Sequence, residues 1–112
     1  MRKQHRLTKN KDFISVYKKG KSTANRFFVL YIAKKAESEP FRLGVSISKK
    51  VGNAVVRNRI KRLVKAVFLD LDKQLPSGYD FIIIARNAAA SLDFAQTQES
   101  LLHILKKAKV DL

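Results

Sequence analysis

The sequence contains no cysteine, few acidic residues and no long apolar run. Without cysteine, neither a disulfide scaffold nor a cysteine-based zinc ribbon or finger can form, and a reducing cytoplasm fits this composition. No apolar run approaches the roughly 18 residues of a membrane span, and the N-terminal stretch MRKQHRLTKNKDF lacks the apolar core of a signal peptide. We therefore expect a soluble cytoplasmic protein with no membrane association.

Side chains for protein-based catalysis are also scarce. His5 lies in an N-terminal segment that we expect to be mobile, and His103 falls on a helical pattern where a surface or packing role is the better interpretation. Asp70 and Asp72 form a bare D-x-D, for which a solvated helix end is more typical than a metal site. There is no glycine-rich phosphate loop and no H-E-x-x-H. These absences predict a binding protein without a catalytic centre, metal site or cofactor of its own.

Positive charge dominates what is present. The chain has 24 Lys and Arg against 9 Asp and Glu, a formal net charge of +15, and residues 40–69 contain no acidic residue at all. Its 112 residues, 46% of them hydrophobic, fit one folded domain. We therefore expect residues 1–112 to form a single domain with a polyanion-binding surface in its first two thirds.

The most informative stretch is SISKKVGNAVVRNRIKRLVKAVF, Ser46 to Phe68. At about 100° per residue it forms a helix with one apolar stripe and a cationic opposite face. A charge run on a helix is usually a solvated face, but such faces mix both signs. Here Arg57, Lys61 and Lys65 form a column of like charges, which costs stability unless a polyanion neutralises it. The residues of the apolar stripe are Val56, Ile60, Leu63, Val64 and Val67.

Patterns along the rest of the chain predict the order helix, three strands, helix, strand, helix. We expect a flexible basic arm over residues 1–6 and a helix over 8–19 capped by Thr8 or Asn10. A short edge strand within 21–26 is followed by strands over 27–33 and 41–48, which the charged turn between them would join as a hairpin. The basic helix runs from an Asn53 N-cap to about residue 71, followed by a buried strand over 79–85, a loop over 86–91 and a final helix that begins with a capping box at Asp93. The fold class is α+β, a two-layer sandwich of helices on a mixed central sheet.

RNA is the polyanion that fits this pattern best. DNA readers of the helix-turn-helix class place a second helix before the recognition helix, whereas strands precede the basic helix here. Phe13, Tyr17, Phe27 and Tyr31 occur in the same basic region, and such side chains stack on unpaired bases. Phe13 and Tyr17, one helical turn apart, could equally serve only to dock their helix on the sheet. A structural ribosomal RNA-binding protein and a DNA-binding regulator remain alternatives from charge and fold class.

Four motifs resemble those of one known family, the bacterial ribonuclease P protein component. SKKVGNAVVRNRIKR, Ser48 to Arg62, is similar to the family signature, with the Arg57-Asn58-Arg59 run at its centre. R-L-x-K-N-x-D-F precedes it at 6–13, Ala24-Asn25-Arg26 stands before a strand, and I-I-I-A-R follows at 82–86. An ordered set over about 100 residues is more specific than a single tripeptide.

The resemblance implies that the chain is an accessory subunit of an endoribonuclease that removes the 5′ leader of precursor tRNA. In that family the catalytic centre and its Mg²⁺ belong to a large RNA subunit, and no obligate protein partner is implied. The family fold resembles a ribosomal small-subunit domain and the fourth domain of elongation factor G. It includes a left-handed strand, helix, strand crossover, which runs against the usual right-handed rule.

Site residues follow by position from the same resemblance. The implied cleft for the precursor tRNA leader lies between the first helix and the sheet, and the implied contact with the catalytic RNA lies on the basic helix. The leader-cleft residues are Phe13, Tyr17, Val29 and Tyr31, bordered by Lys50, Arg57 and Asn58. The residues implied to bind phosphates of the catalytic RNA are Lys49, Arg59, Lys61, Arg62 and Lys65.

Overall fold

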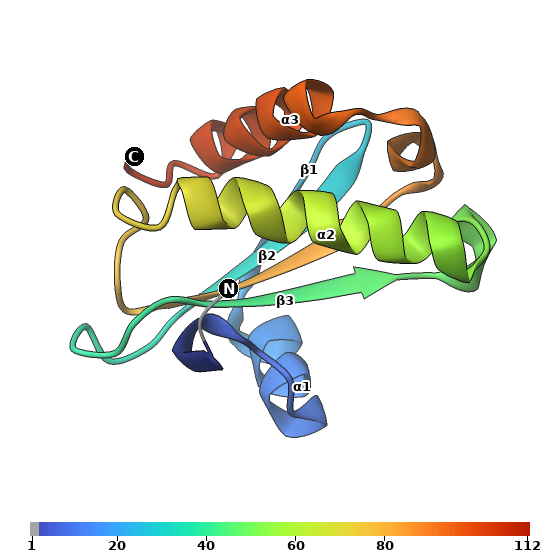
Figure 1. The fold of residues 1–112 in the computed structure, drawn as a ribbon. Helices are drawn as coiled ribbons and strands as arrows, with labels where there is room; N and C mark the ends of the chain where they lie inside the picture. The colour runs from blue at the N-terminus through green and yellow to red at the C-terminus, as the bar shows by residue number, and fades with distance from the viewer. Residues whose placement is uncertain (1–2) are drawn as a thin grey trace.

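A four-stranded mixed sheet forms the centre of the computed structural model, which describes residues 3–112 (Figure 1). The strands are β1 (Lys21–Ala24), β2 (Phe28–Lys34), β3 (Arg42–Ile47) and β4 (Tyr79–Ala85), in the spatial order β1-β2-β4-β3. The helices are α1 (Asn10–Lys19), α2 (Ala54–Asp70) and α3 (Phe94–Lys107), with short 3₁₀ turns η1 (Lys3–His5), η2 (Lys49–Val51) and η3 (Asn87–Ser91). The predicted α+β class, element order and edge strand β1 are confirmed.

The predicted hairpin between β2 and β3 is wrong, because β4 lies between them. Ile82 of β4 pairs with Tyr31 of β2 in the antiparallel direction and with Gly44 of β3 in the parallel direction. β4 is apolar on both faces, so the central position buries more of its side-chain surface than an edge would. The charged connection between β2 and β3 spans the width of β4, and Gly78, just before β4, exchanges backbone hydrogen bonds with it at Lys35 and Glu39.

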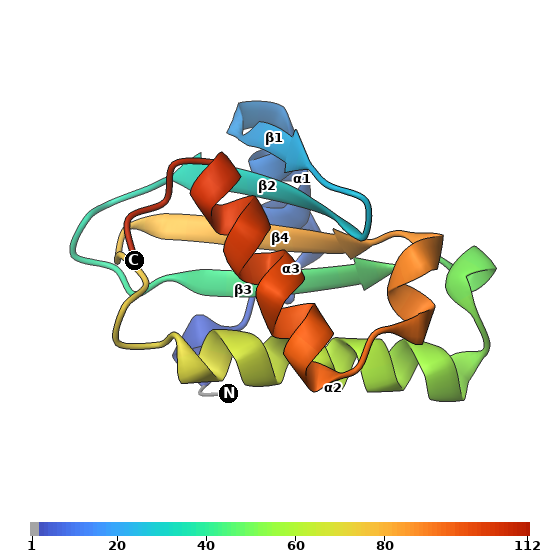
Figure 2. The ribbon, with the colours of Figure 1, turned by 90° about the horizontal axis from the view of Figure 1, so that it is seen from above.

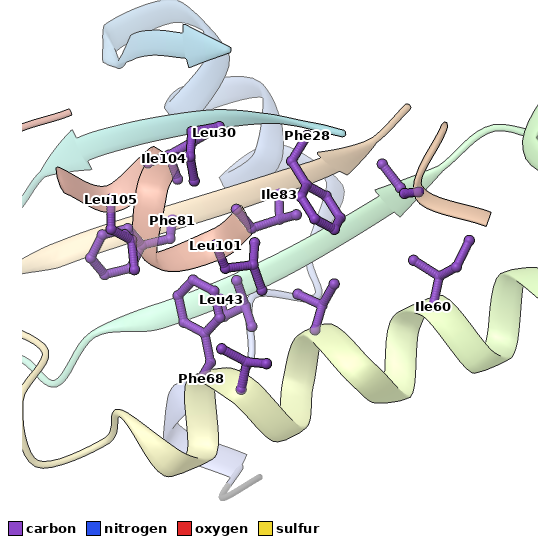
Figure 3. Packing of buried hydrophobic residues seen from close by; sticks show 14 of the residues in the cluster. Phe28, Leu30, Leu43, Ile60, Phe68, Phe81, Ile83, Leu101, Ile104 and Leu105 are labelled. Atoms are coloured by element: carbon purple, nitrogen blue, oxygen red, sulfur yellow. The ribbon is translucent and has the colours of Figure 1, made fainter. Parts of the chain in front are cut away.

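The main core lies between one face of the sheet and the two helices α2 and α3. In Figure 2, α3 crosses this face and α2 runs alongside β3. Figure 3 shows side chains from three sources meeting in this layer: Leu43, Phe81 and Ile83 from strands, Phe68 from α2, and Leu101 from α3. Each of these five side chains is at most 3% exposed. Phe68, one residue beyond the predicted stripe of the basic helix, is among them.

A smaller apolar cluster lies on the opposite face of the sheet under α1. Val16 of α1, Leu7 and Ile82 form its buried centre, and Val16 is 2% exposed. The position of α1 beneath the sheet is visible in Figure 1. The helices therefore cover one face broadly and the other face only in part.

The connection from β3 through α2 to β4 is left-handed, as the family resemblance implies. In Figure 2 the helical face is toward the viewer, β3 and β4 both run from left to right, and β4 lies above β3. A right-handed crossover would place β4 below β3 in this view. Helical periodicity and strand patterns carry no information about this choice.

Residues 3–6, part of the arm that the sequence predicts to be flexible, make specific contacts with the sheet and the end of α2. His5 is 7% exposed, stacks on Phe41 with ring centroids 4.1 Å apart, and places Nδ1 2.7 Å from the Phe41 carbonyl oxygen. Its Nε2 lies 3.4 Å from an Asp72 carboxylate oxygen, and the Leu7 amide donates to the Leu43 carbonyl at 3.0 Å. The N-terminal segment thus extends the sheet beside β3, whereas residues 1 and 2 lie outside the described part of the chain.

Helix boundaries follow the predicted caps in two of three cases. Asn53 accepts a hydrogen bond from the Val56 amide and caps α2, and Asp93 forms the predicted capping box at α3. α1 instead begins after Lys9, which makes no side-chain cap, so the prediction of Thr8 or Asn10 as the cap is wrong. The predicted loop over 86–91 contains η3. Within residues 3–112, no helix has the length and apolar character that a membrane crossing requires.

Candidate nucleic-acid interface

Three aromatic side chains, the aromatic cluster Phe13, Tyr17 and Tyr31, lie where α1 meets the sheet. The Tyr17 and Tyr31 rings meet edge to face with centroids 4.9 Å apart, and the Phe13 and Tyr17 centroids are 6.4 Å apart. Val16 docks α1 on the sheet, which leaves its neighbour Tyr17 38% exposed and Phe13 half-buried. Phe13 and Tyr17 therefore help to dock α1 and also keep ring surface accessible to a ligand.

The floor beside the aromatic cluster is a row of small or apolar side chains across three strands. Ile84 of β4 pairs with Val29 of β2 on one side and with Ser46 of β3 on the other. All three are half-buried, whereas Ile82, two residues before Ile84 on the same face, is fully buried under α1. α1 thus covers one row of the sheet and leaves the next row open, next to the exposed rings.

Gly44 allows Phe13 to approach the sheet. A Cβ atom at this position would lie 2.5 Å from Phe13 Cζ and 3.2 Å from Leu7 Cδ2, closer than the packed interior tolerates. A glycine in the middle of a strand is a signal for such close approach. Gly44, Ser46 and Ile84 are site residues that sequence reasoning missed.

The pKa of the Tyr17 hydroxyl is set by both apolar and polar surroundings on this face. Burial raises its pKa, a hydrogen bond with the Ser46 side chain lowers it, and the neighbouring Tyr31 raises it further. The net shift is upward, so the phenol stays protonated at neutral pH and can donate a hydrogen bond. A neutral donor beside accessible rings suits the edges and faces of bases.

The basic helix α2 presents its cations away from the core, as predicted. Lys61 and Arg62 are exposed, Lys65 is half-buried, and Ile60 and Val64 on the opposite side are at most 2% exposed. Lys49, Lys50, Arg57 and Asn58 occupy η2 and the first turns of α2, at the end of the sheet where β3 finishes. Among residues 3–112, none of the predicted phosphate-binding cations forms an ion pair with an acidic side chain.

Two arginines of the Arg57-Asn58-Arg59 run also have intramolecular partners. Arg57 Nε donates to the Gly52 carbonyl at 3.2 Å, which ties α2 to the turn that precedes it. Arg59 donates from both terminal nitrogens, to the carbonyls of Ala90 and Leu92, and so fastens η3 to α2. Arg59 therefore holds the fold together at this end of the molecule, with its remaining donors available for other partners. Asn58 between them is exposed.

A pocket of about 220 Å³ connects the basic helix to the aromatic cluster. Arg6, Phe13, Lys61 and Lys65 are among the residues that line it, and Leu43 and Val45 of β3 form its apolar side. Burial lowers the pKa of Lys65, and the charges of Lys61 and Arg6 lower it further. Cations from the N-terminal segment and from α2 thus converge beside Phe13. Arg6 reaches this position because it pairs with Leu43 of β3.

Two acidic side chains near this face, Asp12 and Asp80, are paired with Arg42, and Lys35 also contacts Asp80. Arg42 donates to both carboxylate oxygens of Asp80, at 2.9 and 2.8 Å, and lies 3.3 Å from Asp12 of α1. Lys35 adds a contact of 3.0 Å to Asp80. Burial alone would raise the pKa of Asp80, but the hydrogen bonds from Arg42 and Lys35 outweigh it and lower the pKa. These carboxylates therefore add little negative potential where an anion would approach.

The described residues contain no cluster of three or more His, Cys, Asp or Glu side chains that could hold a metal ion. His5 is engaged with Phe41 and Asp72, and His103 lies on α3 within 3.4 Å of Asn25 Nδ2. The open sheet face and the basic helix offer a ligand stacking, hydrogen bonding and charge neutralisation. These features define a class of protein, a small basic α+β domain with an open, aromatic sheet face beside a cationic helix.

Comparison with known proteins identifies the family within this class. The Ribonuclease P family model matches residues 1–109. The chain is 54% identical over 110 residues to a ribonuclease P protein component of Shouchella clausii, covering 98% of this chain and 90% of the relative. It is 49% identical over 108 residues to one from Bacillus cereus, covering 96% and 94%.

Solved structures agree with the sequence relatives. The RNase P protein of Staphylococcus aureus superimposes with a TM-score of 0.90 at 47% identity, over 96% of this chain and 98% of that one. The RNase P protein from Thermotoga maritima gives a TM-score of 0.82 at 34% identity, over 91% and 96%. The chain belongs to the ribonuclease P protein family. Membership implies a role in tRNA 5′ processing, as part of an endoribonuclease with an RNA partner.

Proposed function

We propose that this chain is the protein subunit of ribonuclease P and that it binds two RNAs on adjoining surfaces. The 5′ leader of precursor tRNA lies along the open sheet face between the aromatic cluster and the start of α2. The catalytic RNA subunit binds the cationic side of α2 and supplies both the catalytic centre and the Mg²⁺ ions that hydrolyse the phosphodiester. The protein positions the substrate and takes no part in bond cleavage.

The leader assignment depends most on the exposure of Tyr17 beside a half-open row of the sheet. A helix that served only as cover would bury its aromatic side chains, whereas Tyr17 keeps 38% of its surface accessible. Unpaired bases stack on such rings with little sequence preference. Leader sequences of different precursor tRNAs could share this surface for that reason. Val29 and Tyr31 from β2 extend the apolar area, and Lys50, Arg57 and Asn58 border it on the side of α2.

The assignment of the catalytic RNA depends on unneutralised charge. Lys61, Arg62 and Lys65 lie along α2 without acidic partners among residues 3–112, and Lys49 is exposed on η2. Lysine and arginine without acidic partners gain most when phosphates displace their counterions. Arg59 contributes in a different way, by holding η3 against α2 while part of its guanidinium remains free for phosphate. A cytoplasmic location accompanies this function, as the cysteine-free composition predicts.

A reconstituted cleavage assay tests the proposal. Catalytic RNA from a related bacterium is incubated with precursor tRNA at limiting Mg²⁺, with and without the full chain. We expect the chain to lower the Mg²⁺ requirement and to raise the affinity for leader-bearing substrate. No change in either quantity would reject the proposal, and tight binding to ribosomal RNA instead would favour a structural ribosomal role.

A further inference from the structure

A second cationic pocket lies at the end of the molecule opposite the start of α2. It has a volume of about 390 Å³ and is formed by the end of α1, the start of β1, the end of β2, the start of β4 and the C-terminal residues. Figure 2 shows the end of β2, the start of β4 and the C-terminus at one end of the molecule, and the start of α2 at the other. The pocket is therefore separate from the first turns of α2, and its residues Ile32 and Tyr79 pack on the main core, whereas Tyr31 of the aromatic cluster packs on the opposite face of the sheet.

Four lysines surround this pocket: Lys19, Lys21, Lys34 and Lys109. Asp111 is the one acidic side chain in the lining, so the pocket carries an excess of positive charge. Within residues 3–112, none of the four lysines forms an ion pair or a side-chain hydrogen bond. The neighbouring Lys35 and Lys107 differ, because Lys35 pairs with Asp80 and Lys107 donates to the Ala24 carbonyl. The charges of the four pocket lysines are thus not neutralised by the described part of the fold.

The backbone at Lys109 adds a second observation. Lys109 has φ of 62°, the one positive φ at a residue other than glycine within the described chain. Its amide donates to the Lys106 carbonyl and the Val110 amide donates to the Leu105 carbonyl, which closes α3 at a position where glycine is favoured. A lysine here directs a charged side chain to the rim of the pocket at the expense of backbone strain.

The remainder of the lining is apolar and includes one ring. Ile32, Tyr79 and Val110 are half-buried, and Tyr79 packs against Phe81 with centroids 6.2 Å apart, so its position is fixed. A fixed ring beside aliphatic side chains suits the face of a base, and the surrounding lysines suit the phosphates on either side of it. The volume lies within the range of about 300 to 1,000 Å³ typical of small-ligand pockets.

We propose that this lysine pocket binds one unpaired nucleotide of an RNA strand, with the base against Tyr79 and the flanking phosphates among the lysines. The site would give the protein a third contact with RNA, at the end of the sheet opposite the start of α2. It does not require that the leader occupy the aromatic cluster, and its failure would leave that proposal intact.

Amide-resolved NMR titration of the full chain tests this site. The ligands are inorganic phosphate, a mononucleotide and a trinucleotide without self-pairing, each added to the same sample conditions. We expect the trinucleotide to shift the amides of Lys21, Lys34, Tyr79 and Val110 and to bind at least about tenfold more tightly than the mononucleotide, because further phosphates reach the lysines. Equal affinity for mononucleotide and trinucleotide would contradict an RNA strand as the ligand. Equal shifts with phosphate alone would contradict a base on Tyr79.

Variants connect the signal to the pocket. The pair Lys21→Ala and Lys34→Ala should weaken trinucleotide binding at this site by at least about tenfold, since two charge-assisted contacts are lost. Lys106→Ala, which removes an exposed lysine of α3 outside the pocket lining, is the matched control and should leave the affinity unchanged. Tyr79→Leu keeps an apolar side chain at the core and should weaken the trinucleotide while leaving phosphate binding unaltered. Absence of localised shifts in the unsubstituted chain, or equal loss in the control, would overturn the proposal.

Discussion

Replacement of Tyr17 by alanine separates stacking on the leader from support of the fold. The Tyr17 ring is 38% exposed and lies edge to face on Tyr31 at 4.9 Å, so it presents a free surface while one neighbour fixes its orientation. Loss of one base stack costs about 1 to 3 kcal/mol. That cost corresponds to about 5- to 160-fold in affinity for leader-bearing precursor tRNA. Mature tRNA, which lacks the leader, should bind the reconstituted enzyme almost equally well with either protein.

The assay compares dissociation constants of the two RNAs on the holoenzyme, with Tyr17→Phe as the control. Phenylalanine keeps the ring but removes the hydroxyl that bonds Ser46, so most of the affinity for precursor tRNA should remain. Thermal unfolding of each variant checks that α1 stays docked, which Val16 should ensure because it is 2% exposed. An equal loss of affinity for precursor and mature tRNA would refute a leader surface at Tyr17.

Three further predictions concern Gly44, the arginines of α2 and Asp80. Gly44→Ala places a Cβ 2.5 Å from Phe13 Cζ and should displace that ring, lowering the free energy of unfolding by about 1 to 3 kcal/mol and weakening leader binding; unchanged values of both would show that Phe13 does not pack there. Arg62→Ala should reduce the log–log salt dependence of catalytic RNA binding by about 0.7 to 0.9 per lost phosphate contact, and an unchanged slope would mean that Arg62 touches no phosphate. Arg59→Ala should instead also lower the melting temperature, because it releases the carbonyls of Ala90 and Leu92. The pKa of Asp80 is lowered in the fold, so its stabilising contribution is present above the ordinary carboxyl pKa of about 3.9 and is lost as pH falls through the folded value; Asp80→Asn should remove this acid sensitivity, and identical pH profiles in urea unfolding would contradict it.

Local sequence signals predicted the elements well where a single side chain determines the outcome. Asn53 and Asp93 cap their helices through hydrogen bonds to nearby amides, so the starts of α2 and α3 depend on a few adjacent residues. The continuous apolar run of β4 predicted a strand covered on both faces, and its bounds match the structure. Each of these features depends on residues that are adjacent in the sequence, so the sequence alone was enough to predict it.

Pairing between distant strands could not be read in the same way. The charged turn after β2 resembles a hairpin connection, yet β4 separates β2 from β3 because its apolar faces compete better for the centre of the sheet. The order of residues 3–6 likewise depends on His5 finding Phe41 and Asp72, which are far away in the sequence. The basic composition of the N-terminus predicted a flexible arm, since the sequence alone does not show that His5 meets these distant partners.

In the candidate site, too, the sequence predicted some residues and missed those whose role depends on a distant part of the chain. Phe13, Tyr17, Val29 and Tyr31 follow from motif positions, and the structure brings them onto one face of the sheet. Gly44 was missed, because its role is to admit the ring of Phe13, a residue of another element. Arg6 was expected only as part of a basic arm, so its position beside Phe13 and Lys65 was not foreseen. The intramolecular bonds of Arg59 could not be foreseen from a run of cations either.

Photo-crosslinking of the leader tests whether it lies on the open sheet face beside α1. A precursor tRNA with a photoreactive uridine at successive leader positions is irradiated on the reconstituted holoenzyme, and the crosslinked peptides are mapped by mass spectrometry. We expect crosslinks to α1 and β2 around Tyr17 and Tyr31, with crosslinks from neighbouring leader positions shifting toward Lys50 of η2, just before α2. Crosslinks confined to α3 or to the lysine pocket, with none on α1 or β2, would contradict it.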